Sequence, residues 1–206
     1  MPYIGLKIDI DKAQLDGVKA MLSDISGGAD KALTRSINKS LVNVRTRAVK
    51  EIGADLNLKS SRIKKDFDIK KASFTKMVAF VRCQSVPPGL INFSSRQVRK
   101  GVTTKVRKKG SRKLVKHAFI ATFKGNKHVA KRINKYVGKG VLSTNKKRAW
   151  GMMPRKYRFP IKVLYAVRPA DFMAQPQILN PLEEYASERV ATNLDHEAKA
   201  ILNRYA

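Results

Sequence analysis

The chain keeps most of its positive charge apart from its negative charge. Its last carboxylate before the middle of the sequence is Asp68, and the next is Asp171. Residues 69–170 therefore contain 28 Lys and Arg and no carboxylate, whereas the rest of the chain carries 16 basic and 15 acidic residues. Cations that lack internal counter-charges repel one another in a compact fold, so we expect an anion to neutralise this segment in the working state. Nucleic acid is the expected counter-charge, an acidic protein surface is the alternative, and a membrane surface is not expected.

Length and composition permit a folded core. The 206 residues include 43% hydrophobic side chains, which is enough for one domain with extensions. No apolar run approaches the roughly 20 residues that a membrane-spanning helix needs. Residues 1–9 lack the basic and then apolar order of a secretory signal. Cys83 is the single cysteine, so no internal disulfide forms, which fits a reducing cytoplasm.

The N-terminal part of the chain has the apolar spacing of amphipathic helices. Residues 11–25 are predicted to form a short helix that ends at Ser26-Gly27-Gly28, and residues 29–55 a longer one. A third, short helix is expected from Ser60 and Ser61, which can cap it, through Phe67. The buried stripe of the long helix is predicted to contain Leu33, Ile37, Leu41, Val44, Ala48 and Ile52.

Alternating apolar and polar residues then indicate strands. The predicted strands, in chain order, are 74–82, the short piece 90–93, 102–107, 114–123, 127–133 and 161–167. The fourth and fifth are expected to pair as a hairpin across Lys124-Gly125-Asn126. Residues 138–158 show little periodicity and many cations, which is typical of a long basic loop.

A long C-terminal helix closes the sequence. Asn180 is expected to cap it, with Pro181 in the first turn and Glu183 completing a capping box. The order of helices, strands and a final helix predicts an α+β fold with a mostly antiparallel sheet, helices on one side and long basic loops. We predict an N-terminal extension, residues 1–28, and a single α+β domain, residues 29–206, with a basic insertion loop at 135–158.

The residues give no enzyme signature. A metal-dependent nuclease needs clustered carboxylates to hold its cation, and the basic segment has none. His117 and His128 could approach each other across the predicted hairpin, but ordinary sheet residues or phosphate contacts are the favoured interpretation. Cys83 has no recognisable partner base. We therefore expect no catalytic, metal-binding or cofactor-binding residues, and no cofactor.

The basic residues form two clusters suited to neutralising phosphates or an acidic partner. Neither cluster lies on a recognition helix or a zinc finger, so we expect non-specific contact with the nucleic-acid backbone, weakened by salt. The first cluster contains Arg96, Arg99, Lys100, Lys105, Arg107, Lys108, Lys109, Arg112, Lys113 and Lys116, and the second contains Lys146, Lys147, Arg148, Arg155, Lys156 and Arg158. Trp150, within the second, could be an anchor in a partner's pocket, a base-stacking residue or a local packing residue.

Several short motifs, in their order and spacing, resemble one known family. These are His117-Ala118-Phe119-Ile120, then Gly125, His128-Val129 and Arg132, and finally Arg158-Phe159-Pro160-Ile161. Together they resemble the minor tail protein Z family, the tail completion proteins of lambda-like bacteriophages. The resemblance extends from about residue 29 to the end of the chain. The sequence departs from the family pattern by a longer insertion, at about 135–156.

The resemblance implies a non-enzymatic virion protein that completes the tail near its head-proximal end and is assembled in the host cytoplasm. Its implied neighbours are the tail terminator, other tail or neck proteins and double-stranded virion DNA, and a homo-oligomeric ring would fit such a position. On composition alone, a cellular nucleic-acid-binding protein of the ribosomal or nucleoid type remains an alternative. A nuclease and a scaffold that never touches DNA are further alternatives.

Overall fold

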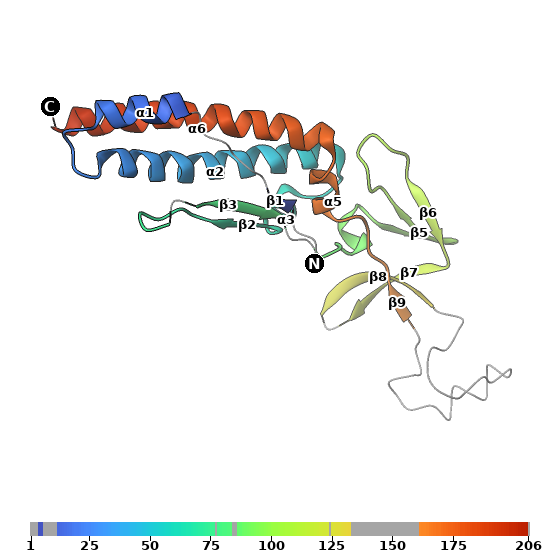
Figure 1. Ribbon diagram of the computed structural model, residues 1–206. Coiled ribbons are helices and arrows are strands. Elements are labelled where there is room, and N and C mark those ends of the chain that lie inside the picture. The colour runs from blue at the N-terminus through green and yellow to red at the C-terminus, as the bar shows by residue number, and fades with distance from the viewer. Residues whose placement is uncertain are drawn as a thin grey trace, which may run out of the picture. The chain divides into compact units, whose positions relative to one another are not determined.

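The computed structural model describes residues 4–5, 12–76, 78–83, 86–123, 125–132 and 161–205. The chain divides into two compact units, which we call the helical unit (Met1–Val86 with Arg168–Ala206) and the basic β unit (Pro87–Val167) (Figure 1). The α+β class is confirmed, although the described strands form three small antiparallel sheets and not one. The predicted domain boundaries stay predictions, and the insertion loop at 135–158 lies outside the described residues.

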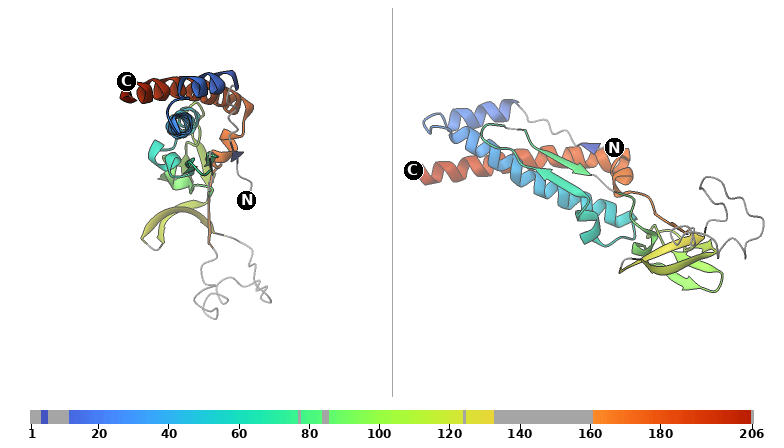
Figure 2. Two further views of the ribbon diagram at one scale, coloured as in Figure 1. Left: turned by 60° about the vertical axis from the view of Figure 1, so that its left-hand side comes forward. Right: turned by 90° about the horizontal axis from the view of Figure 1, so that it is seen from below.

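Two long antiparallel helices form the centre of the helical unit. α2 (Gly28–Asp55) confirms the predicted long helix, and α6 (Pro176–Tyr205) runs beside it in the opposite direction (Figures 1 and 2). Many of the facing residues are Ala or Ser, and small side chains allow two helices to approach closely. The buried stripes contain Ala32, Ser36, Ser40, Val44, Ala48 and Ile52 of α2 and Leu182, Ala186, Val190, Leu194 and Ala198 of α6.

A buried chain of hydrogen bonds fixes the register of these two helices. The Asn193 side-chain amide donates to Ser40 Oγ (2.8 Å), and Ser40 Oγ donates to the Ser36 carbonyl (2.8 Å). A sliding movement of one helix would bury these polar groups without partners, which is unfavourable. α1 (Lys12–Met21) then packs over one end of the pair, where Val18 and Leu22 join a cluster with Leu194.

The start of α6 differs from the prediction. The helix begins at Pro176, so Asn180 is not its cap and Pro181 lies inside it. The Gln175 carbonyl accepts hydrogen bonds from the first-turn amides of Ile178 and Leu179 (both 2.9 Å), which marks the true N-terminus. Proline also fits a first helical turn, and the sequence offered two such prolines. A short helix, α5 (Pro169–Met173), precedes α6 and buries Phe172 and Met173.

The region between α2 and the basic β unit was predicted wrongly in two places. α3 (Ser60–Lys64) is capped by the backbone of Lys59 without a side-chain hydrogen bond, and it ends before Phe67. Phe67 instead begins β2 (Phe67–Lys70), which pairs with β3 (Phe80–Cys83). Because this pairing sets Lys70 opposite Phe80, residues 71–79 must reverse the chain, so only the end of the predicted strand 74–82 is extended. β1 (Ile4–Gly5) completes the sheet in the order β1-β3-β2.

Two three-stranded sheets and a 3-10 turn make up the described part of the basic β unit. The first sheet contains β4 (Arg96–Val98), β5 (Gly101–Thr104) and β6 (Lys113–Lys116). The second contains β7 (Ala118–Phe123), β8 (Asn126–Arg132) and β9 (Ile161–Val163). Leu90, Val102, Ala118 and Val129 form the core between these elements.

The hairpin of β7 and β8 confirms the prediction, with Gly125 in the left-handed region (φ 79°). Three other expectations change. The predicted strand 114–123 is divided at His117, whose positive φ of 61° redirects the chain from β6 into β7. Residues 90–92 form the 3-10 turn η1 (Leu90–Asn92) in place of a strand, and β9 is shorter than the predicted 161–167. Tyr165 still makes an isolated bridge to Gly89.

The close packing of α2 and α6 gives the first prediction. Ala186 is fully buried in α6, so Ala186→Leu should force the two helices apart and lower the free energy of unfolding by about 1–3 kcal/mol. The matched control is Ala54→Leu, at an exposed position of α2, which should leave stability nearly unchanged. Urea unfolding followed by circular dichroism measures both, and equal effects of the two substitutions would contradict the packing described here.

Candidate nucleic-acid interface

The basic β unit contains no carboxylate at all. Residues 87–167 include 23 Lys and Arg and no Asp or Glu, which leaves 21 basic and 15 acidic residues for the helical unit. The helical unit can therefore pair its charges internally, as Lys39 does with Glu197 (3.6 Å) and Arg47 with Glu51 (2.7 Å). The cations of the basic β unit have no such partner within their own unit, so their repulsion can be relieved only by an anion from outside it.

The first sheet places the predicted cluster at its two ends. The turn between β4 and β5 carries Arg99 and Lys100, and the register sets Lys116 opposite Gly101 at the same end. The long connection from β5 to β6 supplies the other end, which Arg96 joins because it lies opposite Thr103. The cations of that connection are Lys105, Arg107, Lys108, Lys109 and Arg112, and Lys113 begins β6 at the same end. All ten described members of the predicted cluster are exposed except Lys105, which is half-buried.

Residues 94–116, where the sequence predicted one strand and the start of another, contain all three strands of the first sheet. Hydrogen bonds from side chains to backbone groups hold this segment in place. Gln97 bridges the two sheets, because its Oε1 accepts from the Ile120 amide (2.9 Å) and its Nε2 donates to the Gly101 carbonyl (3.0 Å). Arg112 Nη1 donates to the Ser94 carbonyl (2.8 Å), which ties the connection to the start of β4. The cations are thus displayed on a fixed scaffold.

The pairing of β5 with β6 requires glycine at position 101. Its φ of 151° lies in the region that residues with a side chain rarely adopt. A Cβ at this position would lie 2.1 Å from the Val115 carbonyl oxygen on β6, which is backbone and cannot rotate away. At the same end of the sheet, the His117 amide donates to the Lys100 carbonyl (3.1 Å) and closes the turn.

The second sheet adds cations that the sequence analysis did not assign. Lys131 of β8 lies directly opposite Lys162 of β9, and both are exposed. Like charges at opposed positions of neighbouring strands destabilise a sheet. Lys127 is exposed on the same face, since it lies four residues before Lys131. Val129 lies between Lys127 and Lys131 on the same face of β8 and is buried, so the strand pattern gave no clear signal for these cations, and the pairing of Lys131 with Lys162 needed the register.

The second predicted cluster cannot be placed. Residues 133–160 lie outside the described part of the chain, and they include every member of that cluster. The predicted roles of Lys146, Lys147, Arg148, Arg155, Lys156 and Arg158, and of Trp150 as a partner anchor, therefore stay predictions.

The described residues offer little for metal chemistry or for a cysteine nucleophile. Among them, no group of three or more His, Cys, Asp and Glu residues is placed to hold a metal ion. His128 pairs with Ala121, four residues along β7 from His117, so the two histidines do not face each other. Burial, with smaller contributions from Asp66 and Asp171, raises the pKa of the Cys83 thiol to about 12. Cys83 is therefore a protonated thiol at neutral pH and a poor nucleophile.

The described helices were also assessed as membrane spans, and none combines the length and hydropathy needed to cross a bilayer.

Comparison with known proteins identifies one family. The family model described as "Prophage minor tail protein Z (GPZ)" matches residues 15–206, which is nearly the whole chain. No curated protein and no solved structure matches significantly. The match favours a phage tail protein over the cellular nucleic-acid-binding protein that composition alone permitted.

The scaffold gives the second prediction. Gly101→Ala should destabilise the β4-β5-β6 sheet, by about 1–3 kcal/mol from the unfavourable φ and further from the contact with Val115. The control is Gly17→Ala in α1, where a Cβ meets nothing within 4 Å and the helix should gain slightly in stability. Amide hydrogen exchange of residues 101–116 measures the change. Unaltered protection of these amides in Gly101→Ala would show that the close pairing of β5 and β6 is wrong.

Proposed function

Because this chain belongs to the prophage minor tail protein Z family, we propose that it completes the phage tail at its head-proximal end, where it contacts virion DNA through the basic β unit. Its place as a tail protein of the virion follows from the family. The head-proximal position, the contact with DNA and the neighbours are the proposal. The neighbours are the tail terminator and other tail or neck subunits, and the role is structural, without catalysis.

The observation that carries this proposal is the exposed, uncompensated charge of the basic β unit. Duplex DNA carries one negative charge for each roughly 1.7 Å of its axis, and binding by Lys and Arg releases the counter-ions condensed on it. A protein at the head-proximal end of the tail would meet the genome where it enters. Anionic backbone would then neutralise both ends of the first sheet and the opposed Lys131 and Lys162 of the second.

The contact is expected to be independent of base sequence. The described cations lie mainly at strand ends and turns, and they are Lys and Arg side chains suited to phosphate. Gln97, an amide that could read a base edge, already uses its oxygen and nitrogen within the unit. A tail protein must accept any genome sequence that passes it, so contact with phosphates alone suits the position.

A homo-oligomeric ring is part of the proposal. Several copies around the tail axis would present several basic β units to one duplex. Each contact could then be weak and salt-sensitive, while the assembly held the DNA firmly, because linked contacts reinforce one another.

Removing charge from the first sheet tests the DNA contact. The substitutions Lys108→Gln, Lys109→Gln, Lys113→Gln and Lys116→Gln leave Arg112 in place, since it fastens the scaffold. If each lysine neutralises one phosphate, the slope of log affinity for a duplex against log salt concentration should become shallower by about 3–4. Fluorescence anisotropy with a labelled duplex of arbitrary sequence measures it.

The matched control removes the same charge from the helical unit, by Lys12→Gln, Lys50→Gln, Lys65→Gln and Lys199→Gln, all at exposed positions. Both variants lower the formal charge of +29 by four. The control should change the slope by less than about 1. Equal slopes in the two variants would mean that DNA responds to total charge, and the assignment to this sheet would fail.

A further inference from the structure

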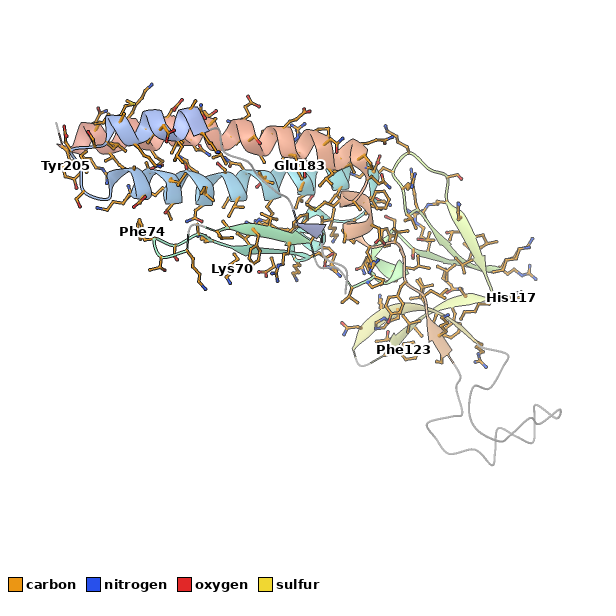
Figure 3. All side chains as sticks on the ribbon, in the orientation of Figure 1. Lys70, Phe74, His117, Phe123, Glu183 and Tyr205 are labelled. Carbon is orange, nitrogen blue, oxygen red and sulfur yellow. The ribbon has the colours of Figure 1, made fainter. Side chains whose placement is uncertain are left out.

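A second surface of the chain combines exposed apolar side chains with cations. It lies in the helical unit, at the reversal between β2 and β3, where Phe74 and Val78 are 60% and 69% exposed. Figure 3 labels Phe74 at this reversal and Lys70 further back, at the end of β2. Turns usually carry Gly, Asn, Asp, Pro or Ser, and Ser73 is the only such residue among residues 71–79; its hydroxyl accepts a hydrogen bond from the Lys76 amide (3.2 Å). Two large apolar side chains exposed beside one turn favour contact with a partner.

Hydrogen bonds hold residues 72–76 of the reversal. The Ser73 amide donates to the Lys76 carbonyl (2.9 Å), and the Lys76 amide donates to the Ser73 carbonyl (3.1 Å). Behind this turn, Asn38 of α2 clamps the backbone of Ala72, because its Nδ2 donates to the Ala72 carbonyl (3.0 Å) and its Oδ1 accepts from the Ala72 amide (2.8 Å). Phe74 is therefore presented on a support fixed to a long helix, which lowers the entropy lost on binding.

Several exposed cations lie close in sequence to the apolar residues. Lys70, Lys71 and Lys76 are exposed, and the guanidinium of Arg82 stacks 4.2 Å from the centre of the Phe80 ring. Lys70 Nζ lies 5.6 Å from the same ring. Residues 69–81 contain Lys70, Lys71 and Lys76 and no carboxylate, whereas Arg82 lies opposite Asp68 of β2. The surface thus has an apolar tip and a positively charged collar.

This combination selects one kind of partner. The phosphates of duplex DNA would neutralise the collar, but DNA has no apolar pocket for the aliphatic side chain of Val78. A second copy of this chain is also a poor match, because its exposed carboxylates Glu184, Glu188 and Asp195 on α6 are interspersed with the polar Ser187 and Thr192. An apolar pocket bordered by carboxylates complements both the tip and the collar.

We propose that the β2–β3 reversal is a docking peg, which inserts Phe74 and Val78 into an apolar pocket with an acidic rim on a different protein subunit of the tail. This inference rests on the proposed function, since it identifies the chemistry of a tail neighbour. It concerns a surface separate in sequence from the proposed DNA contact, so each can fail without the other.

The probe is the phage tail without this protein, purified from phage that carries a nonsense codon in the gene for this protein. Full-length protein is added to such tails, and its binding is measured by co-sedimentation. Phe74→Ser with Val78→Ser should weaken binding at least tenfold, and Lys71→Glu with Lys76→Glu should weaken it as well. The matched control, Val42→Ser with Tyr205→Ser, removes two other exposed apolar side chains of the helical unit and should bind like the wild type.

Thermal unfolding and affinity for duplex DNA should be the same in the wild type and the Phe74 and Val78 variant, which separates docking from folding and from the DNA contact. If the Phe74 and Val78 variant binds the tails as tightly as the wild type does, the docking peg is overturned and the proposed function is left intact. Failure of the wild type to bind the tails would contradict both. Loss of self-association in the variant, or loss of binding to anionic phospholipid vesicles, would overturn the peg by assigning the surface to a second copy or to a membrane.

Discussion

Uncompensated positive charge is the constraint on which the rest of this structure depends. The basic β unit must fold although it has no carboxylate of its own. It relies on a small apolar core around Val102 and Val129 and on neutral hydrogen bonds such as those of Gln97. The helical unit is built differently, because it balances its charges with ion pairs and buries long facing stripes of α2 and α6. The helical unit thus balances most of its charge internally, whereas the basic β unit requires an anion from outside the unit.

This contrast gives each unit its own part in the proposed assembly. A helical unit with a fixed helix pair offers a firm base from which a reversal such as that at Phe74 can contact another protein. The basic β unit exposes many cations on short strands and turns, which suits contact with a polyanion of variable sequence. The family assignment joins the two, since a tail protein at the proposed position has both protein neighbours and DNA to contact.

The sequence predicted those features that depend on local spacing. Apolar residues spaced by three or four located α2, although Leu33 and Ile37 of the predicted stripe are only half-buried. Gly125 located the hairpin of β7 and β8. Both signals are contained in a few consecutive residues. Features set by pairing between distant segments were missed. The alternation in residues 74–82 suits a strand, yet pairing of Phe67 with Cys83 forces part of it to turn.

The candidate site shows the same limit. Charge alone located the cluster from Arg96 to Lys116, because an acid-free run is visible in the sequence. The opposed Lys131 and Lys162 could not be recognised, since 30 positions separate them and only the register of β8 and β9 brings them together. The start of α6 was misplaced because Pro176 and Pro181 both suit a first helical turn, and the stripe at Leu182 fits either choice.

The central claim, that this protein completes the tail at the end nearest the head, is tested most directly by locating it in the virion. Gold-labelled antibodies against the full-length protein, imaged on intact phage particles by electron microscopy, give that location. The account predicts label at the junction of head and tail. Label confined to the distal tip of the tail, or a particle proteome without this protein, would contradict it.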